Sequence, residues 1–161
     1  DELMRFRLDV LAQHDLRLEA IERVIGGLAP MPGAVGFLDS LRERYQVIIL
    51  SDTFYEFSRP LMAQLNWPTL FCHHLTTDGS GRITGYELRQ DEPKNSSVAA
   101  LQSLNFRVIA AGDSYNDTAM LKQADKGFLF RAPERVIEEF PQFPHTNDYA
   151  ELRAFIDDAA G

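Results

Sequence analysis

Short apolar runs that alternate with helix-like segments are the feature of this sequence that most constrains its fold. Residues 47–50, 107–111 and 127–130 have the length and the apolar, partly β-branched content of buried parallel strands. The segments with a helical spacing of apolar residues are 34–44, 55–65, 96–104, 117–123, 133–139 and 149–159. Strands and helices in alternation require crossover connections, so the sequence predicts an α/β fold, a three-layer, doubly wound parallel sheet with helices on both faces.

Two further segments stand apart from this alternation. Residues 69–88 have a period of two around Asp78-Gly79-Ser80-Gly81, which predicts a β-hairpin. The first thirty residues have the pattern of two short helices, and Pro30-Met31-Pro32-Gly33 then breaks the chain. We therefore expect a small helical part over residues 1–30 and the main domain over residues 31–161.

Composition narrows the class of protein. With 161 residues, 45% of them hydrophobic, the chain can bury one core. A net charge of −8 leaves no stripe of Lys and Arg for nucleic acid, and no run approaches the roughly 18 apolar residues of a membrane span. The single cysteine, Cys72, cannot form an internal disulfide, so we expect a reducing, cytoplasmic location.

Polar residues follow the first apolar run directly. In such sheets ligands bind beyond the carboxyl ends of the strands, so residues at these positions are candidates for chemistry. Ser51-Asp52-Thr53 offers a hydroxyl and backbone N–H groups, which suit an anionic oxygen. The alternative is that Ser51 or Thr53 only caps the next helix.

A second polar segment, Gly112-Asp113-Ser114-Tyr115-Asn116-Asp117, follows the run at 107–111. Asp113 and Asp117 stand four residues apart around a turn, so both carboxylates can face one point. Hard oxygen ligands of this kind suit Mg²⁺, which takes one or two protein carboxylates and keeps several waters. The alternative is a capped helix start, with Asp117 near the positive end of the dipole.

Lys94 is the third candidate. It lies at the start of a predicted helix, where the dipole disfavours a positive charge, so we expect a phosphate and nearby carboxylates to hold it. The alternative is a solvated surface lysine. Together, the hydroxyl of Ser51, the ammonium of Lys94 and the carboxylate of Asp113 are predicted to surround one phosphate-sized pocket beside a cation.

These segments resemble the motifs of the haloacid dehalogenase superfamily. Ser51 matches its second motif, Lys94 its third, and residues 112–117 its fourth. The branch of phosphoserine phosphatases also described as homoserine phosphotransferases is similar over VIILSDTFYEF (47–57), AAGDSYND (110–117) and EFPQFP (139–144). Ordinary phosphoserine phosphatases have Ser-Gly-Gly where this chain has Ser51-Asp52-Thr53, which favours the phosphotransferase-like branch.

The resemblance implies an Mg²⁺-dependent enzyme that moves the phosphoryl group of O-phospho-L-serine to water, and to homoserine, through an aspartyl-phosphate. It implies that Ser51, Lys94 and the backbone of Asp52 bind the phosphoryl group. It further implies that Asp113 is a direct Mg²⁺ ligand and that Asp117 supports the metal site.

The same resemblance implies how the substrate is selected. Asn116 would orient substrate or phosphate. In this family a helical cap chooses the substrate, and residues 1–30 resemble its later part. Arg7 aligns best with the cap arginine that meets the substrate carboxylate, with Arg5 as the alternative.

The family's first motif has no counterpart in these residues. That motif, Asp-x-Asp or Asp-x-Glu on the first strand, supplies the nucleophile and the general acid–base group. No such pair occurs here. We therefore expect the first strand and part of the cap to be missing, as in a fragment of a longer protein, and the 161-residue chain to have no phosphatase turnover. The alternative function is a catalytically dead module that keeps the phosphate and Mg²⁺ contacts.

Overall fold

The structure, a computed structural model, describes residues 2–14 and 16–161, and for residues 2–5 and 7 it describes the backbone alone. It forms two units, residues 1–89 and residues 90–161. Among the described residues, no helix has both the length and the apolar character that crossing a membrane requires. The expected boundary after residue 30 stays a prediction.

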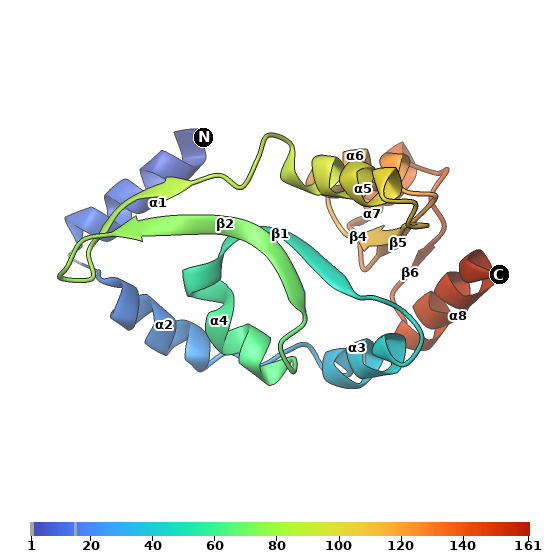
Figure 1. Ribbon diagram of the computed structural model, residues 1–161, viewed down its shortest axis with the longest axis horizontal. Coiled ribbons are helices and arrows are strands. Elements are labelled where there is room, and N and C mark those ends of the chain that lie inside the picture. Colours follow the sequence, from blue (N-terminus) through green and yellow to red (C-terminus); the bar gives the residue numbers. More distant parts are fainter. Residues whose placement is uncertain (1, 15) are drawn as a thin grey trace. The chain divides into compact units, whose positions relative to one another are not determined.

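The first unit is built on a three-stranded sheet with the order β1-β2-β3. β2 pairs in parallel with β1 and antiparallel with β3, and Figure 1 shows it as the long curved strand of this unit. Helix α2 packs against α4. The elements are α1 (Glu2–Gln13), α2 (Leu18–Gly26), α3 (Ala34–Arg42), β1 (Ile48–Phe54), α4 (Tyr55–Gln64), β2 (Thr69–Thr77) and β3 (Ile83–Glu87).

The predicted hairpin is confirmed, and its turn shows why the chain reverses there. The Oδ1 atom of Asp78 accepts hydrogen bonds from the amide of Ser80 at 2.9 Å, from the hydroxyl of Ser80 at 2.7 Å and from the amide of Arg82 at 3.1 Å. Gly81 has a φ of 78°, a backbone conformation that favours glycine. A side chain that satisfies backbone donors and a glycine with positive φ together fix a tight turn.

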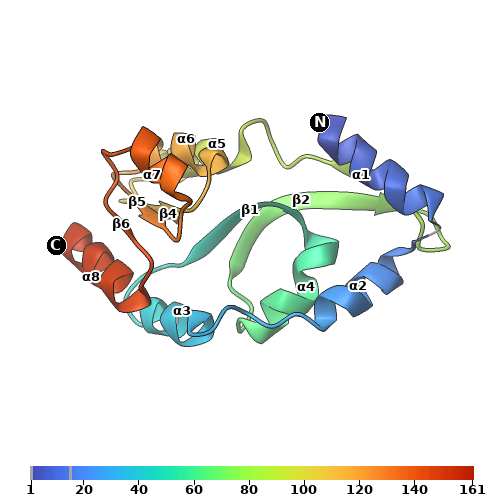
Figure 2. The same ribbon diagram turned by 180° about the vertical axis from the view of Figure 1, so that it is seen from behind.

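The second unit contains the parallel sheet β4-β5-β6. α6 and α8 pack on this sheet, and α5 lies beside α6 (Figure 2). Gly127 is needed at the α6–β5 junction, because a Cβ there would lie 2.5 Å from the carbonyl oxygen of Leu121. The elements are α5 (Pro93–Ser103), β4 (Ile109–Gly112), the 3₁₀ helix η1 (Tyr115–Asp117), α6 (Thr118–Gln123), β5 (Lys126–Phe130), α7 (Glu134–Glu139), β6 (His145–Thr146) and α8 (Tyr149–Ala160).

The predicted α/β class is confirmed, since parallel pairs joined through helices occur in both units. Two differences concern strands. β1 continues through Ser51 to Phe54 rather than ending at Leu50, and the two-residue strand β6 carries too little pattern to be predicted.

Each unit buries its own apolar side chains. In the first unit Met62, Leu65, Leu70 and Cys72 form one cluster, and burial raises the pKa of the Cys72 thiol to about 11. The Cys72 side chain has no exposed surface. In the second unit the fully buried large side chains are those of Val98, Leu121, Leu129 and Val136.

Candidate active site

The loop that follows β4 is folded around one carboxylate. The Oδ2 atom of Asp117 accepts hydrogen bonds from the amide of Asp113 at 3.0 Å and from the amide and hydroxyl of Ser114 at 3.1 and 2.9 Å. Gly112 makes this possible, because a Cβ at that position would lie 2.5 Å from the Cβ of Asp117. The glycine of the motif is therefore required by the close approach of Asp117 to the backbone.

Lys94 completes the environment of this carboxylate. Its ammonium donates to Oδ1 of Asp117 at 2.8 Å, and the side chains of Lys94 and Asp117 are 14% and 8% exposed. Lys94 is the second residue of α5, after Pro93, where the helix dipole disfavours a cation. The carboxylate expected beside Lys94 is thus that of Asp117, which offsets this cost.

The surroundings of Asp117 act on its pKa in opposite directions. Burial raises it, while the hydrogen bond and charge of Lys94 and the hydrogen bonds from Ser114 and Asp113 lower it more, so the pKa lies below its usual value. Asp117 is therefore ionised at neutral pH and forms an ion pair with the Lys94 ammonium. Its two oxygens accept four hydrogen bonds, an arrangement suited to supporting a cation site from outside it.

Asp113 is the residue of this loop that could bind a cation directly. Its side chain is exposed, and none of the described residues donates a hydrogen bond to its carboxylate. Mg²⁺ commonly takes one or two carboxylates and fills its remaining positions with water and phosphate oxygens, so the donor chemistry fits. No group of three or more His, Cys, Asp or Glu side chains suited to a metal occurs within the described residues. A cation at Asp113 would therefore need further ligands, such as water and phosphate oxygens.

Ser51, Asp52 and Thr53 form an irregular stretch inside β1. Leu50 pairs with Phe71 and Phe54 pairs with His73, so three residues of β1 stand opposite the single residue between them on β2. The amide of Thr53 donates to the Ser51 hydroxyl at 3.3 Å. A bulge of this kind re-aims side chains and amides at the end of a strand.

The alternative that Ser51 or Thr53 caps the next helix is wrong. Helix α4 begins at Tyr55, its N-cap residue is Phe54, and no side chain makes a capping hydrogen bond there. The polar residues of the bulge are therefore not explained by the helix that follows.

A buried histidine beside the bulge was not predicted from the sequence. His73 is 4% exposed, and its Nδ1 accepts a hydrogen bond from the amide of Arg89 at 3.1 Å. Burial lowers the pKa of His73, the charge of Asp52 opposes this, and the charge of Arg89 lowers it further, for a net decrease. No local pattern in the sequence predicts this contact, because Arg89 and Asp52 lie 16 and 21 positions from His73 and approach it only through strand pairing.

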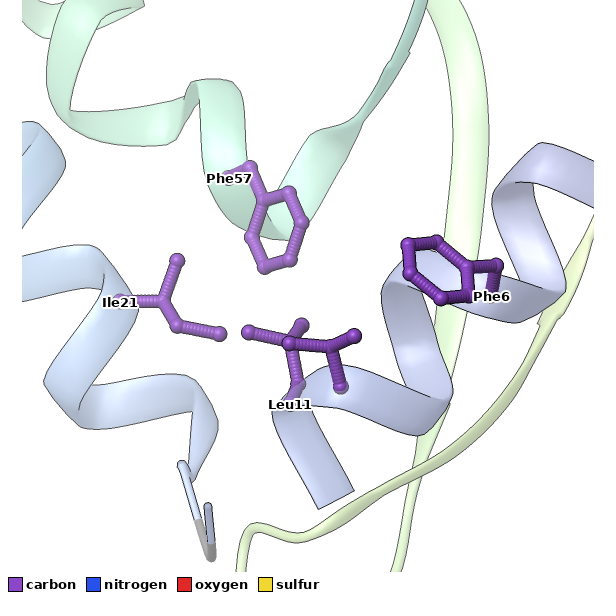
Figure 3. Close-up of a pocket in the computed structure, with 5 residues that line it drawn as sticks. Phe6, Leu11, Ile21 and Phe57 are labelled. Carbon is purple, nitrogen blue, oxygen red and sulfur yellow. The ribbon is translucent and has the colours of Figure 1, made fainter. Parts of the chain in front are cut away.

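The first unit also contains an apolar pocket of about 390 Å³. Figure 3 shows the side chains of Phe6, Leu11, Ile21 and Phe57 turned toward a common space between α1, α2 and α4. Val10 completes the lining. An unpaired charge in such surroundings is costly, so this pocket does not suit a phosphate group.

Comparison with known proteins connects these features. The sequence model of the haloacid dehalogenase-like hydrolases matches residues 2–125. The chain belongs to this family. Its α/β fold is therefore that of a haloacid dehalogenase-like hydrolase.

Relatives place this haloacid dehalogenase-like hydrolase in the phosphoserine phosphatase branch. It is 60% identical over 153 residues to phosphoserine phosphatase ThrH of Pseudomonas aeruginosa, covering 95% of this chain and 75% of that protein. It is 59% identical over 153 residues to a phosphoserine phosphatase of Pseudomonas syringae pv. tomato, covering 95% of this chain and 65% of the relative. The chain thus spans only part of each relative.

Solved structures agree on the fold. A phosphoserine phosphatase structure described as a phospho-aspartyl intermediate analogue has a TM-score of 0.71 at 22% identity, covering 87% of this chain and 70% of that one. A substrate-bound phosphoserine phosphatase has a TM-score of 0.63 at 18% identity, covering 92% and 82%. The predicted membership of the superfamily and of this branch is confirmed.

The hydrolase's predicted site residues fall into both units. Lys94, Asp113, Asn116 and Asp117 belong to the second unit; Asn116 is exposed in η1. Ser51 and Asp52 belong to the first unit, so the predicted convergence of Ser51, Lys94 and Asp113 stays a prediction. The side chains of the two cap candidates, Arg7 and Arg5 in α1, lie outside the described residues.

Proposed function

We propose that this haloacid dehalogenase-like hydrolase supplies the phosphate- and cation-binding residues of a phosphoserine phosphatase. The reaction would transfer the phosphoryl group of O-phospho-L-serine to water, and to homoserine, through an aspartyl-phosphate. The observation that carries the proposal is the ion pair between the partly buried Lys94 and the buried Asp117, on a loop that Gly112 allows to fold closely around Asp117. The 60% identity to the Pseudomonas aeruginosa phosphoserine phosphatase supports the choice of substrate. We also propose a reducing, cytoplasmic location, on the ground of the single, unpaired Cys72.

Charge neutralisation would be the main contribution of these residues. The Lys94 ammonium and the Ser51 hydroxyl would bind the phosphoryl oxygens, helped by the backbone of Asp52. Asp113 would hold Mg²⁺, which when bound supplies positive charge to the phosphoryl oxygens. Asp117, already saturated by hydrogen bonds, would hold Lys94 and the loop in place.

Substrate recognition would come from residues around this centre. Asn116 would orient the substrate or phosphate, and its exposed position in η1 leaves its amide accessible. Arg7, or Arg5, would bind the substrate carboxylate from the helical cap. Asp52 stands where ordinary phosphoserine phosphatases have a glycine, and we propose on this ground that the chain belongs to the phosphotransferase-like branch.

The nucleophile is proposed to lie outside these 161 residues, because the sequence contains no Asp-x-Asp or Asp-x-Glu. The same observation favours a second candidate, a module that binds phosphate and Mg²⁺ without turnover. Both candidates share the binding residues and differ in whether an aspartyl-phosphate forms.

Two measurements on the 161-residue chain test the proposal. Isothermal titration with inorganic phosphate should show binding that requires Mg²⁺ and is lost in Asp113→Asn, while the control Lys126→Met binds like the parent chain. Phosphate release from O-phospho-L-serine should equal the blank. Phosphate binding that does not depend on Mg²⁺ and persists in Asp113→Asn contradicts the assigned site. Release of phosphate by the 161-residue chain contradicts the proposal that the nucleophile lies outside it.

A chimaera separates the two candidates. The part of the Pseudomonas aeruginosa relative that this chain does not cover is joined to it in one polypeptide. Phosphate release, and phosphohomoserine when homoserine is present, would support the enzyme. A folded chimaera that binds phosphate without turnover would support the binding module.

A further inference from the structure

Tyr115 ties the outer side of the loop after β4 to helix α7. Its hydroxyl donates to Oε1 of Glu139 at 2.6 Å. Its ring packs edge-on against Phe140, with centroids 6.1 Å apart, and the guanidinium of Arg135 lies 5.6 Å from its centroid. All of these contacts lie within the second unit, and none of them is made by a residue assigned above to phosphate or cation binding.

Helix α7 is a firm support for this contact. Val136 is 1% exposed and so fixes the helix in the core of the second unit. At its end, Phe140 stacks with Phe143 at 6.3 Å and lies beneath the ammonium of Lys122 at 5.0 Å. Glu139 therefore presents its carboxylate from a helix that is also held by contacts outside the loop.

The inner side of the loop is held in a different way. The carboxylate of Asp117 accepts hydrogen bonds from the amides of Asp113 and Ser114. The Asp113 carboxylate itself accepts no hydrogen bond from any of the described residues. Its direction thus follows from the loop backbone alone. A loop released on one side samples further conformations, and the apparent affinity for a ligand falls in proportion to the lost competent fraction.

We infer that Tyr115 is a positioning residue, which through its hydrogen bond to Glu139 holds the 113–117 loop in the conformation that aims Asp113 at a cation. The inference rests on the proposed function, because it takes Asp113 as the cation ligand. It assigns an exposed hydrogen bond, between Tyr115 and Glu139, a role in cation binding.

The first test measures cation affinity in the 161-residue chain. Mn²⁺, which takes the same hard oxygen ligands as Mg²⁺, is titrated and the free ion is counted by electron paramagnetic resonance. Tyr115→Phe and Glu139→Ala should each weaken binding roughly 3–10-fold, which is within the range of one typical hydrogen bond. The double variant should be no weaker than either single one, because both remove the same contact. Glu139→Gln keeps an acceptor and should restore affinity to within roughly twofold of the parent chain.

Two control variants separate an effect of the Tyr115 contact on Mn²⁺ affinity from a failure of the proposed cation site. Tyr86→Phe removes a hydroxyl in the first unit and should leave Mn²⁺ binding unchanged, whereas Asp113→Asn should abolish it. Parent-like affinity in Tyr115→Phe, with Asp113→Asn abolishing binding, overturns the inference while the proposed cation site stands. Parent-chain binding that survives Asp113→Asn instead counts against the proposed cation site itself.

A second readout needs no cation. Backbone amide exchange at Asp113 and Ser114 should speed up in Tyr115→Phe in metal-free buffer, while the amides of β5 keep their protection. Unchanged exchange at Asp113 and Ser114 overturns the inference, whatever the cation measurement shows. Faster exchange across the whole second unit indicates a general loss of stability, which also counts against a positioning role.

Discussion

Two polar segments that follow short apolar runs of the sequence, residues 51–53 and 112–117, hold their side chains by different means. In the second unit, Asp117 is buried, accepts four hydrogen bonds and pairs with Lys94. In the first unit, Ser51 lies in a bulge of β1 and accepts a longer hydrogen bond from the amide of Thr53, at 3.3 Å. The loop after β4 is thus shaped by a charged side chain, and the bulge mainly by strand pairing.

The difference bears on how each segment could act on a phosphate. Groups that are fixed before the ligand arrives need no reorganisation when charge develops, and this favours the loop after β4. A bulge instead offers backbone amides and a short hydroxyl whose positions depend on the neighbouring strand. Removing the Lys94 charge beside the loop after β4 should therefore lower the free energy of unfolding far more than removing the Ser51 hydroxyl from the bulge.

Removing the Lys94 charge should have the largest effect. Lys94→Met leaves Asp117 buried without its cation, which we expect to lower the free energy of unfolding by about 3 kcal/mol. Urea denaturation followed by circular dichroism measures the loss. Lys126→Met, an exposed lysine of β5, should change it by less than about 0.5 kcal/mol. Equal effects of the two variants would show that the Lys94–Asp117 pair does not stabilise the loop after β4.

The glycine under Asp117 offers a steric test of the same loop. Gly112→Ala places a Cβ 2.5 Å from that of Asp117 and should cost about 2 kcal/mol of unfolding free energy. Gly36 in α3 is the matched control, because nothing lies within 4 Å of its Cβ position. Gly36→Ala should stabilise by about 0.5–1 kcal/mol, since alanine is the better helix former. If Gly112→Ala is also stabilising, the close approach is not a constraint.

The two units should also lose stability in different pH windows. The pKa of Asp117 is lowered in the folded chain, so its contribution is present above about pH 4 and is lost as the pH falls through the folded value. The pKa of His73 is lowered from 6.5, so its contribution is complete above pH 6.5 and declines as the pH falls below that value.

Urea unfolding between about pH 3 and pH 8 measures both contributions. Lys94→Met removes the group that lowers the pKa of Asp117, so its deficit relative to the parent chain should shrink below about pH 4. The ring resonances of His73 should titrate below pH 6.5, and lower still in Asp52→Asn, which removes the opposing charge. A His73 titration at or above 6.5 contradicts the assignment.

The smallest effect on stability is expected at Ser51. Ser51→Ala removes the acceptor of one long hydrogen bond and should change the free energy of unfolding by less than about 0.5 kcal/mol. Its affinity for inorganic phosphate should nevertheless fall roughly 3–10-fold if the hydroxyl binds the phosphoryl group. Denaturation and calorimetry on the same variant separate the two outcomes, and a loss of stability without a loss of phosphate binding would make Ser51 a structural residue.

The sequence predicts the elements whose pattern is local. The apolar run at residues 47–50, the hairpin around Asp78 and the turn at Gly112 all carry their signal within a few neighbouring residues. The dipole argument also predicts that Lys94 needs carboxylates near it, because the cost of a cation at a helix start does not depend on the rest of the fold.

Contacts between distant residues could not be predicted in this way. The pairing of Lys94 with Asp117, of Tyr115 with Glu139 and of Arg89 with His73 joins residues 23, 24 and 16 positions apart. Such pairs exist only once strands and helices have packed. For the same reason the extension of β1 through its bulge is set by pairing with β2 rather than by local propensity.

The buried thiol of Cys72 provides a probe for local unfolding of the first unit. Its side chain has no exposed surface and its pKa of about 11 keeps the thiolate scarce at neutral pH. A thiol reagent therefore reacts at an appreciable rate only with molecules in which β2 has separated from its neighbours. The rate of single-site labelling then counts how often this unit opens, with no label or substitution introduced in advance.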